Sequence, residues 1–280
     1  MDIAYEILPL VFLLLSLGAV AGFLAGLLGV GGGIVLVPGL FYIFTSLQAQ
    51  FGFDPSYLMH MSIGTSLAII VPTGFSSALS HHKKGGVDFD LLKALGGGIV
   101  AGVILATWIA KGLDAMTLRM IFATALCILA MIMIVGRARF QQEDGEKPKQ
   151  PKTSIAGFVI GGISTMIGIG GATLSVPYMS LHGVPMHRAV GTASALGLVI
   201  SIPATMGFIM IGWGLDNLPP MSLGYVNVLA WLCIIPVSVF IAPIGAKAAH
   251  KISVRRLKMT FAVFMILVAL NMWRKILMGG

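Results

Sequence analysis

The sequence predicts an all-α polytopic membrane protein built from two inverted-topology repeats of five helical segments each. Of its 280 residues, 57% are apolar and 10% are Asp, Glu, Lys or Arg, whereas about 25% of a soluble protein is charged. The chain also divides into ten apolar segments, and two glycine-containing blocks recur in the same order in its two halves. So few charges cannot cover a surface in water, and the expected solvent is therefore a bilayer.

Each apolar segment is expected to be a helix, because a backbone in lipid must satisfy its own hydrogen bonds. Glycine (36 residues) and proline (13 residues) are too frequent for plain spanning rods. They favour interrupted helices of the kind that transporters use. The segments cover residues 7–28, 34–47, 58–80, 89–110, 116–136, 154–168, 171–182, 188–213, 225–246 and 255–277.

A long polar stretch separates the two halves. Its sequence, RARFQQEDGEKPKQPKT, mixes charges, contains two prolines and has no apolar periodicity, which is typical of a solvated linker. We therefore expect an N-terminal transmembrane repeat at 1–136, a cytoplasmic linker at 137–153 and a C-terminal transmembrane repeat at 154–280.

The two halves repeat each other. GVGGGIVLVP at 29–38 aligns with GIGGATLSVP at 168–177, and MHMSIGTS at 59–66 aligns with MHRAVGTA at 186–193. Two matches in the same order indicate internal duplication. Because each half has five segments, an odd number, the second copy should run inverted relative to the first.

Loop charges agree with an inverted arrangement that has both termini outside. In that topology fourteen of the 18 Lys and Arg residues fall on the cytoplasmic side, in keeping with the positive-inside rule. The four outer residues are Lys111, Arg119, Arg274 and Lys275.

Two segments of the second half are too short to span. Residues 153–168 and 171–182 each fall below the length of about 20 residues that a span needs. They fit a re-entrant hairpin that turns at its glycine-rich tip. By repeat symmetry, 7–28 and 34–47 form the matching hairpin, although 7–28 is long enough to span. Full spans and hairpins both return the chain to its starting side, so both remain open.

The glycine-rich tips are the first candidate for a binding site. A helix start at membrane depth presents unpaired amides and a partial positive charge, which suits an anion without a buried Lys or Arg. Glycine also lets a substrate approach the backbone closely. Close packing or a flexible hinge is the alternative. The predicted substrate-binding positions are Gly31, Gly32, Gly33, Gly170, Gly171 and Ala172.

Hydroxyl side chains are the second candidate. Thr65 and Thr192 occupy equivalent positions in the two repeats, with Ser66 and Ser194 close by. Hydroxyls can donate hydrogen bonds to an oxyanion, so we predict that these four residues help to bind the substrate. The alternative for any one hydroxyl is a bond to its own helix or to a neighbouring helix.

Two histidines are candidates for gate or vestibule residues. His60 and His187 occupy equivalent positions near opposite membrane faces, and Arg188 follows the second. The alternative is a solvated interfacial side chain. No Asp or Glu falls in the middle of an apolar segment, which disfavours a dedicated proton or sodium relay. Export of an anion from a cell with a negative interior needs no coupling ion.

Several other classes are disfavoured. The sorting of basic residues to one side indicates orientation and not nucleic-acid binding. Cys127 and Cys233 lie inside apolar segments and are expected to be core residues. An acidic N-terminus disfavours a cleaved signal peptide. We expect no metal and no cofactor, and the sequence lacks the GxSxG and HExxH motifs of hydrolytic enzymes.

The repeated blocks resemble the sulfite exporter TauE/SafE family, also called the toluene sulfonate uptake permease family. The likeness rests on GVGGGIVLVP with AIIVPTGFSSALSHH downstream, and on GIGGATLSVP followed by HRAVGTASALG. It covers nearly the whole chain. The resemblance implies a bacterial or archaeal inner-membrane permease for sulfite, sulfonates or related organic anions. The family is usually described with seven or eight spans, fewer than the ten segments here.

We therefore predict a secondary transporter that exports sulfite or an organosulfonate by alternating access. It sits in membrane lipid, and a homodimer is one oligomeric option. Elevator-like and rocking motions are both open. The alternative keeps the fold and reverses the direction, with uptake of a sulfonate or carboxylate that a proton gradient could drive. A membrane scaffold or sensor is a third reading.

Overall fold

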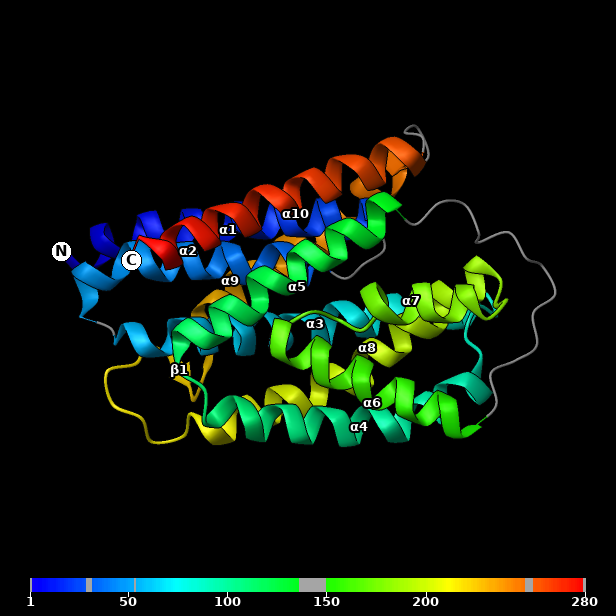
Figure 1. Cartoon of the computed structure of the whole chain (residues 1–280). Coiled ribbons are helices and arrows are strands. Elements are labelled where there is room, and N and C mark those ends of the chain that lie inside the picture. The colour runs from blue at the N-terminus through cyan, green and yellow to red at the C-terminus, as the bar shows by residue number, and fades with distance from the viewer. Residues whose placement is uncertain (1, 29–31, 53, 136–149, 250–253, 279–280) are drawn as a thin grey trace.

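The computed structural model describes residues 2–28, 32–52, 54–135, 150–249 and 254–278, and this part of the chain is almost entirely helical (Figure 1). The first half contains α1 (Asp2–Leu28), α2 (Gly33–Phe51), the 3-10 turn η1 (Pro55–Tyr57), α3 (Leu58–Lys83), α4 (Phe89–Lys111) and α5 (Ala115–Val135). The second half contains α6 (Gln150–Ile167), α7 (Ala172–Leu181), α8 (Met186–Ile211), β1 (Ser222–Leu223), β2 (Val226–Asn227), α9 (Val228–Ala249) and α10 (Val254–Leu277).

Seven helices of the described chain are long and apolar enough to cross a membrane: α1, α3, α4, α5, α8, α9 and α10. The apolar parts of α2 and α6, Gly33–Gln48 and Thr153–Ile167, are shorter. Helix α7 has ten residues, about 15 Å at 1.5 Å per residue, which is half the hydrocarbon thickness. The protein is therefore a multi-pass helical membrane protein, and each of the ten predicted segments contains a helix.

One short antiparallel ribbon, in which β1 pairs with β2, interrupts the helices of the described chain. The predicted segment 225–246 begins in this ribbon, and its helix starts only at Val228. Asn227 causes the delay by capping α9: its side-chain oxygen accepts a hydrogen bond from the amide of Ala230 at 2.8 Å. Helix α6 begins at Gln150, inside the predicted linker, and linker residues 137–149 lie outside the described residues.

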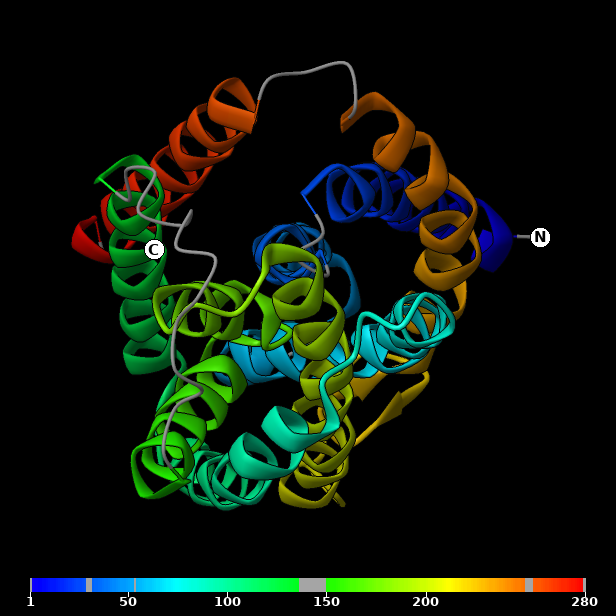
Figure 2. The same cartoon turned by 90° about the vertical axis from the view of Figure 1, so that its right-hand side faces the viewer.

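The long helices pack in pairs. Helix α1 lies along α9, α4 along α6, and α5 along α10, while α3 packs against α8. Viewed from one end (Figure 2), the first three pairs occupy the periphery and α2 and α3 lie between them. Burial agrees with this placement, because every residue of α3 from Leu58 to Ile70 is buried.

Glycines allow the two closest pairs to form. A side chain at Gly22 of α1 would place its Cβ 2.5 Å from the Cα of Ser238 in α9. Likewise, a Cβ at Gly161 of α6 would collide with the backbone oxygen of Ile99 in α4. Small residues at such seams let helix backbones touch, which is how helices associate in lipid.

The burial of α3 changes along its length. Its N-terminal half is buried, whereas residues 71–83 are all partly or fully exposed. An apolar helix that is half core and half accessible must border either lipid or a cavity. The hydroxyl side chains of this second half line a cavity.

Candidate functional site

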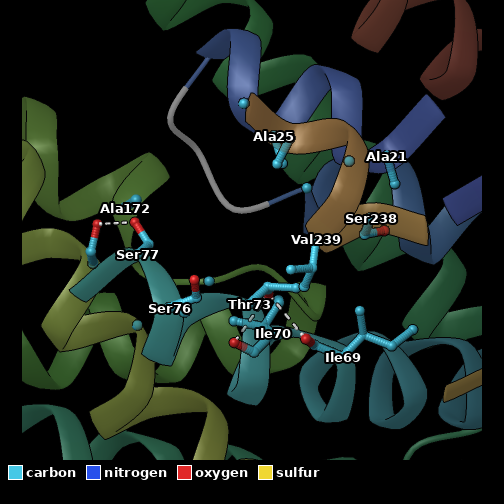
Figure 3. Close-up of a pocket in the computed structure, with 18 of the residues that line it drawn as sticks. Ala21, Ala25, Ile69, Ile70, Thr73, Ser76, Ser77, Ala172, Ser238 and Val239 are labelled. Atoms are coloured by element: carbon cyan, nitrogen blue, oxygen red, sulfur yellow. Dashed lines mark hydrogen bonds between the residues drawn. The ribbon is translucent and has the colours of Figure 1, made fainter. Parts of the chain in front are cut away.

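A cavity of about 360 Å³ lies where helices from both halves meet (Figure 3). Its walls come from α1, α2, α3, α7, α8 and α9. None of the described residues that line it is Lys, Arg, Asp or Glu. Six carry hydroxyls: Thr73, Ser76, Ser77, Ser80, Ser194 and Ser238.

Helix α3 supplies most of the hydroxyls. Thr73 donates to its own helix, at 3.0 Å from the carbonyl oxygen of Ile69. Ser77 donates across the cavity wall to the hydroxyl of Ser194 at 3.1 Å, and these two side chains join α3 to α8. The side chain of Ser76 is exposed and lies beside the cavity (Figure 3). These groups can donate hydrogen bonds to an anion without bringing a buried charge.

Both glycine-rich tips reach the cavity. Gly32 is the N-cap of α2 with φ of 73°, a left-handed conformation that favours glycine. It lines the cavity, as do Gly170 and Ala172 at the start of α7. Neither helix start has a side-chain cap, so its first amides lack partners within the helix. Gly31 lies outside the described residues.

The two tips also touch each other. A Cβ at Gly33 would lie 2.8 Å from the carbonyl oxygen of Gly168, so glycine is what permits the contact. The same carbonyl accepts a hydrogen bond from the buried hydroxyl of Ser66 at 2.8 Å. Ser66 therefore fixes the second tip and is not among the cavity-lining residues. Gly171 is also off the cavity wall and packs against Ile200.

Thr65 and Thr192 are fully buried and lie outside the cavity lining. The hydroxyl of Thr65 accepts a hydrogen bond from the amide of Asn227, the residue that caps α9, at 2.9 Å. The hydroxyl of Thr192 accepts from the amide of Asp88, the N-cap of α4, at 2.9 Å. Each threonine thus holds the cap residue of a helix in the other half of the chain.

His60 and His187 differ sharply despite their equivalent sequence positions. His60 is buried, with its Nε2 atom 3.0 Å from the carbonyl oxygen of Ala110, and its ring stacks on Tyr225 at 4.9 Å between centroids. Tyr225 lies between the β-strands, and burial raises the pKa of its hydroxyl to about 12. His187 is exposed. Neither histidine lines the cavity.

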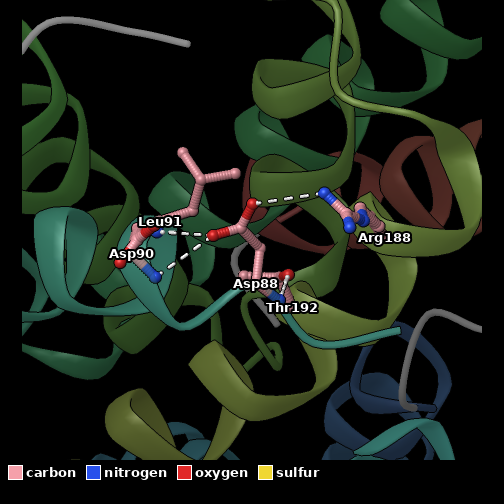
Figure 4. A network of polar contacts seen from close by, with 5 residues as sticks. All are labelled: Asp88, Asp90, Leu91, Arg188 and Thr192. Carbon is pink, nitrogen blue, oxygen red and sulfur yellow. Dashed lines mark hydrogen bonds and ion pairs between the residues drawn. The ribbon is translucent and has the colours of Figure 1, made fainter. Parts of the chain in front are cut away.

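Arg188 belongs to a polar network at the start of α4 (Figure 4). Its guanidinium lies 4.0 Å from a carboxylate oxygen of Asp88. The other oxygen of Asp88 accepts hydrogen bonds from the amides of Asp90 and Leu91, which caps α4. Because the Arg188 side chain is half exposed, this ion pair contributes less than a buried one.

Sequence reasoning missed much of the cavity wall. Ser80 and His81 extend it to the end of α3, and Ser238 with Val239, Ala242 and Pro243 of α9 forms another side. Hydroxyls such as Thr73 and Ser77 are visible in the sequence, but a hydroxyl on a helix does not reveal which neighbour it faces. No pattern in the sequence of α9 indicated that this helix would form part of the cavity wall.

The chain is similar to known proteins over nearly its whole length. The sulfite exporter TauE/SafE family profile matches residues 14–272. A probable membrane transporter protein of Haemophilus influenzae is 37% identical over 266 residues, which cover 95% of this chain and 98% of that protein.

More distant relatives agree. The probable membrane transporter protein YunE of Bacillus subtilis is 29% identical, with 91% of this chain and 94% of that protein covered. The probable membrane transporter protein MJ0441 of Methanocaldococcus jannaschii is 26% identical, with 91% and 92% covered. With its apolar helices and its cavity between the two halves, the chain therefore belongs to the sulfite exporter TauE/SafE family of membrane transporters.

Proposed function

We propose that the protein is a secondary transporter that moves a small sulfur-containing anion, sulfite or an organosulfonate, by alternating access through the cavity. The observation that carries the proposal is the cavity wall itself: two helix starts without side-chain caps and six hydroxyls, with no charged side chain. Uncapped amides and hydroxyls bind an oxyanion by donating hydrogen bonds. Weak neutral donors also let the anion leave again, as transport requires.

An inverted repeat is part of this proposal, and the packing supports it. Gly18 of α1 meets the backbone of Ile234 in α9, and Gly157 of α6 meets the backbone of Leu95 in α4. Gly157 lies 139 positions after Gly18, and Ile234 lies 139 positions after Leu95. The same contact thus occurs twice with the halves exchanged. A pseudo-two-fold arrangement of this kind gives a transporter two equivalent ways to close.

The buried threonines support the same exchange of halves. Asn227 lies 139 positions after Asp88 and Thr192 lies 127 positions after Thr65, so the bonds Thr65–Asn227 and Thr192–Asp88 are counterparts. In this arrangement 1–136 and 154–280 are the two repeats. The short helices α2, α6 and α7 then line up as parts of hairpins or broken helices.

The sidedness of the cavity favours an inward-facing conformation. Its α3 wall runs from Ile69 to His81, next to Lys83, and the positive-inside rule assigns Lys83 to the cytoplasm of a bacterial or archaeal inner membrane, with both termini outside. The opposite half of α3 is sealed by hydrogen bonds, among them Trp231 to the carbonyl oxygen of Ala68 at 3.0 Å. An exporter loads its substrate from this inward-facing state.

The cavity is larger than sulfite needs. About 360 Å³ equals the volume of about 12 waters at about 30 Å³ each. Its apolar wall, with Leu36, Ile69 and Val239, suits the carbon part of an organosulfonate. Export of either anion gains about 2.3 kcal/mol per charge per 100 mV of inside-negative potential.

Reconstituted vesicles test the proposal. Purified protein in liposomes with an imposed inside-negative potential should speed the efflux of sulfite, or of sulfoacetate and other organosulfonates without a positive charge, above that of empty liposomes. The comparison of sulfite with the organosulfonates identifies the substrate. Efflux equal to that of empty liposomes for every anion would reject the proposal.

Proton-coupled uptake is the second candidate, and one observation favours it. His81 is the only titratable side chain among the described residues that line the cavity, and it could carry a proton in with a sulfonate or carboxylate. In that case anion influx should rise with an inward proton gradient. His81→Gln should remove the dependence on the gradient while leaving potential-driven flux intact.

A further inference from the structure

Two serines of the second half are buried without a hydrogen-bond partner in the described protein. Ser175 of α7 and Ser201 of α8 are both 0% exposed, and neither hydroxyl has a partner. Buried polar groups are nearly always paired, so an orphaned hydroxyl needs an explanation.

Thr173 and Thr205 of the same two helices are unpaired as well, but most other buried hydroxyls among the described residues do pair, and several do so with their own helix. Ser62 donates to the carbonyl oxygen of Leu58 at 2.7 Å, and Thr165 donates to that of Gly161 at 2.8 Å. This bond to the residue four positions earlier is the ordinary fate of a serine or threonine in an apolar helix. Ser175 and Ser201 do not use it, so interhelical packing alone does not account for them.

Each of the two serines has a counterpart in the first half of the chain, found from the offset between the repeated blocks. Ser175 lies 139 positions after Leu36, the offset that relates the two glycine blocks. Ser201 lies 127 positions after Gly74, the offset that relates Thr65 to Thr192. Helices α3 and α8 both have 26 residues, so this second offset holds along their length. Leu36 and Gly74 both line the cavity.

The helix faces that carry the serines are pressed together at present. A Cβ on Gly171 would lie 3.5 Å from the hydroxyl of Ser175 and 3.8 Å from the amide nitrogen of Gly197. Ser201 follows Gly197 by one helical turn, and residues four apart share a helix face. Both serines therefore sit on the faces of α7 and α8 that meet at Gly171.

We propose that Ser175 and Ser201 belong to a second anion half-site, collapsed in this conformation, that opens to the outside when the transporter faces outward. The proposal rests on the transport function above and adds residues to it. In the outward-facing state the contact between α7 and α8 at Gly171 opens, and Ser175 and Ser201 line the opening as Leu36 and Gly74 line the cavity now. The two hydroxyls then donate hydrogen bonds to the sulfonate or sulfite oxygens, and Ser175 lies one turn from the start of α7, whose amides face the same anion.

The half-site makes the transporter chemically asymmetric. On the inward side the corresponding positions are Leu36 and Gly74, which have no hydroxyl, and the donors there are Thr73, Ser76 and Ser77. The equivalents of these three in α8 are Ile200, Pro203 and Ala204. The anion therefore exchanges one set of hydroxyl donors for another as access switches sides.

Sided kinetics of Ser201→Ala and Ser175→Ala test the proposal. Anion flux is measured in vesicles of one orientation, with substrate added first outside and then inside. We expect the KM for substrate at the outer face to rise about tenfold, the effect of losing a hydrogen bond to a charged group. The KM at the cytoplasmic face should not change. Because an orphaned hydroxyl is removed, the melting temperature should not fall.

Ser62→Ala is the matched control, because its hydroxyl is equally buried but bonded to its own helix. It should keep both KM values. Unchanged KM values at both faces in the Ser201 and Ser175 variants would overturn the proposal. An equal rise of the KM at both faces together with a lower melting temperature would also overturn it, because that result is expected if the serines only pack the helices.

Cysteine labelling gives a readout that does not depend on flux. In a background with Cys127 and Cys233 replaced by alanine, Gly74→Cys should react with a membrane-impermeant maleimide from the cytoplasmic face and Ser201→Cys from the outer face. The space at Gly74 accepts a Cβ, whose nearest contact would be 3.5 Å away. Absence of outer labelling at Ser201→Cys would overturn the half-site while wild-type flux persists. Absence of wild-type flux with outer labelling intact would instead reject the transport function.

Discussion

At the scale of single residues, the paired threonines act as anchors between the halves. Thr65 and Thr192 recur in sequence because each accepts a hydrogen bond from a helix-capping residue of the opposite half. A glycine precedes each of them, and both glycines contact backbone: Gly64 faces the carbonyl of Tyr225, and Gly191 faces that of Gly86. The Gly-Thr pair thus joins a helix to the start of its neighbour.

Replacing either threonine with valine should therefore destabilise the protein. Val keeps the shape of Thr but removes the acceptor of the Asn227 or Asp88 amide, and losing the partner of a buried donor such as the Asn227 amide costs about 1–3 kcal/mol. Thermal melting of the purified protein in detergent measures the effect. Thr65→Ser and Thr192→Ser keep the hydroxyl and should melt close to wild type. A valine variant as stable as its serine counterpart would contradict the anchoring role.

The recurrence of these threonines is visible in the sequence, but their hydrogen-bond partners could not be predicted from it. Recurrence of Thr65 and Thr192 marked them as special, and a bond to a neighbouring helix was one of two readings. Choosing between them requires knowing that Asn227, 162 positions away, starts the adjoining helix. No short-range pattern carries that information.

At the scale of helices, glycine seams determine which helices pair. Helices α1 and α6 each place glycines four residues apart against α9 and α4, a spacing that is visible in the sequence and typical of close helix packing. Not all glycines belong to seams: Gly96 and Gly97 of α4 have nothing within 4 Å of where a Cβ would sit. The two kinds should respond differently to substitution.

Gly161→Ala should destabilise the α4–α6 pair, because the new Cβ collides with the backbone oxygen of Ile99. Overpacking of this kind costs about 1–3 kcal/mol. Gly97→Ala is the matched control, and it should be neutral or stabilise by up to about 1 kcal/mol through higher helix propensity. Chemical unfolding followed by circular dichroism compares them. Equal stabilities of the two variants would contradict the seam.

The elements differ in how well the sequence predicted them. Long apolar segments were visible because a span needs many consecutive apolar residues. The ribbon of β1 and β2 was missed because two-residue strands show no alternation. It matters because it positions Asn227 to cap α9 and Tyr225 to stack on His60.

At the scale of the whole molecule, the proposed inverted repeat accounts for the cavity as the asymmetric closure of two similar halves. The cavity occupies one side of the contact between the glycine tips, where Gly32, Gly170 and Ala172 face it. On the other side Ser66 and Trp231 donate hydrogen bonds to backbone carbonyls and seal the path. The sequence predicted the tips as a binding site, but composition and motifs say nothing about which side of the cavity is open.

The passage of the anion through this cavity is the central claim, and a pair of adjacent substitutions tests it most directly. Ser76 borders the cavity, while the neighbouring Phe75 is 61% exposed and does not line it. Ser76→Trp should block the cavity without removing a recorded hydrogen bond, whereas Phe75→Trp should leave it open.

The measurement is the initial rate of organosulfonate or sulfite efflux from vesicles that hold equal amounts of each variant. We predict that Ser76→Trp lowers the rate at least about tenfold, which corresponds to about 1.4 kcal/mol, while Phe75→Trp stays near wild type. Equal rates for the two variants would contradict an anion path through the cavity.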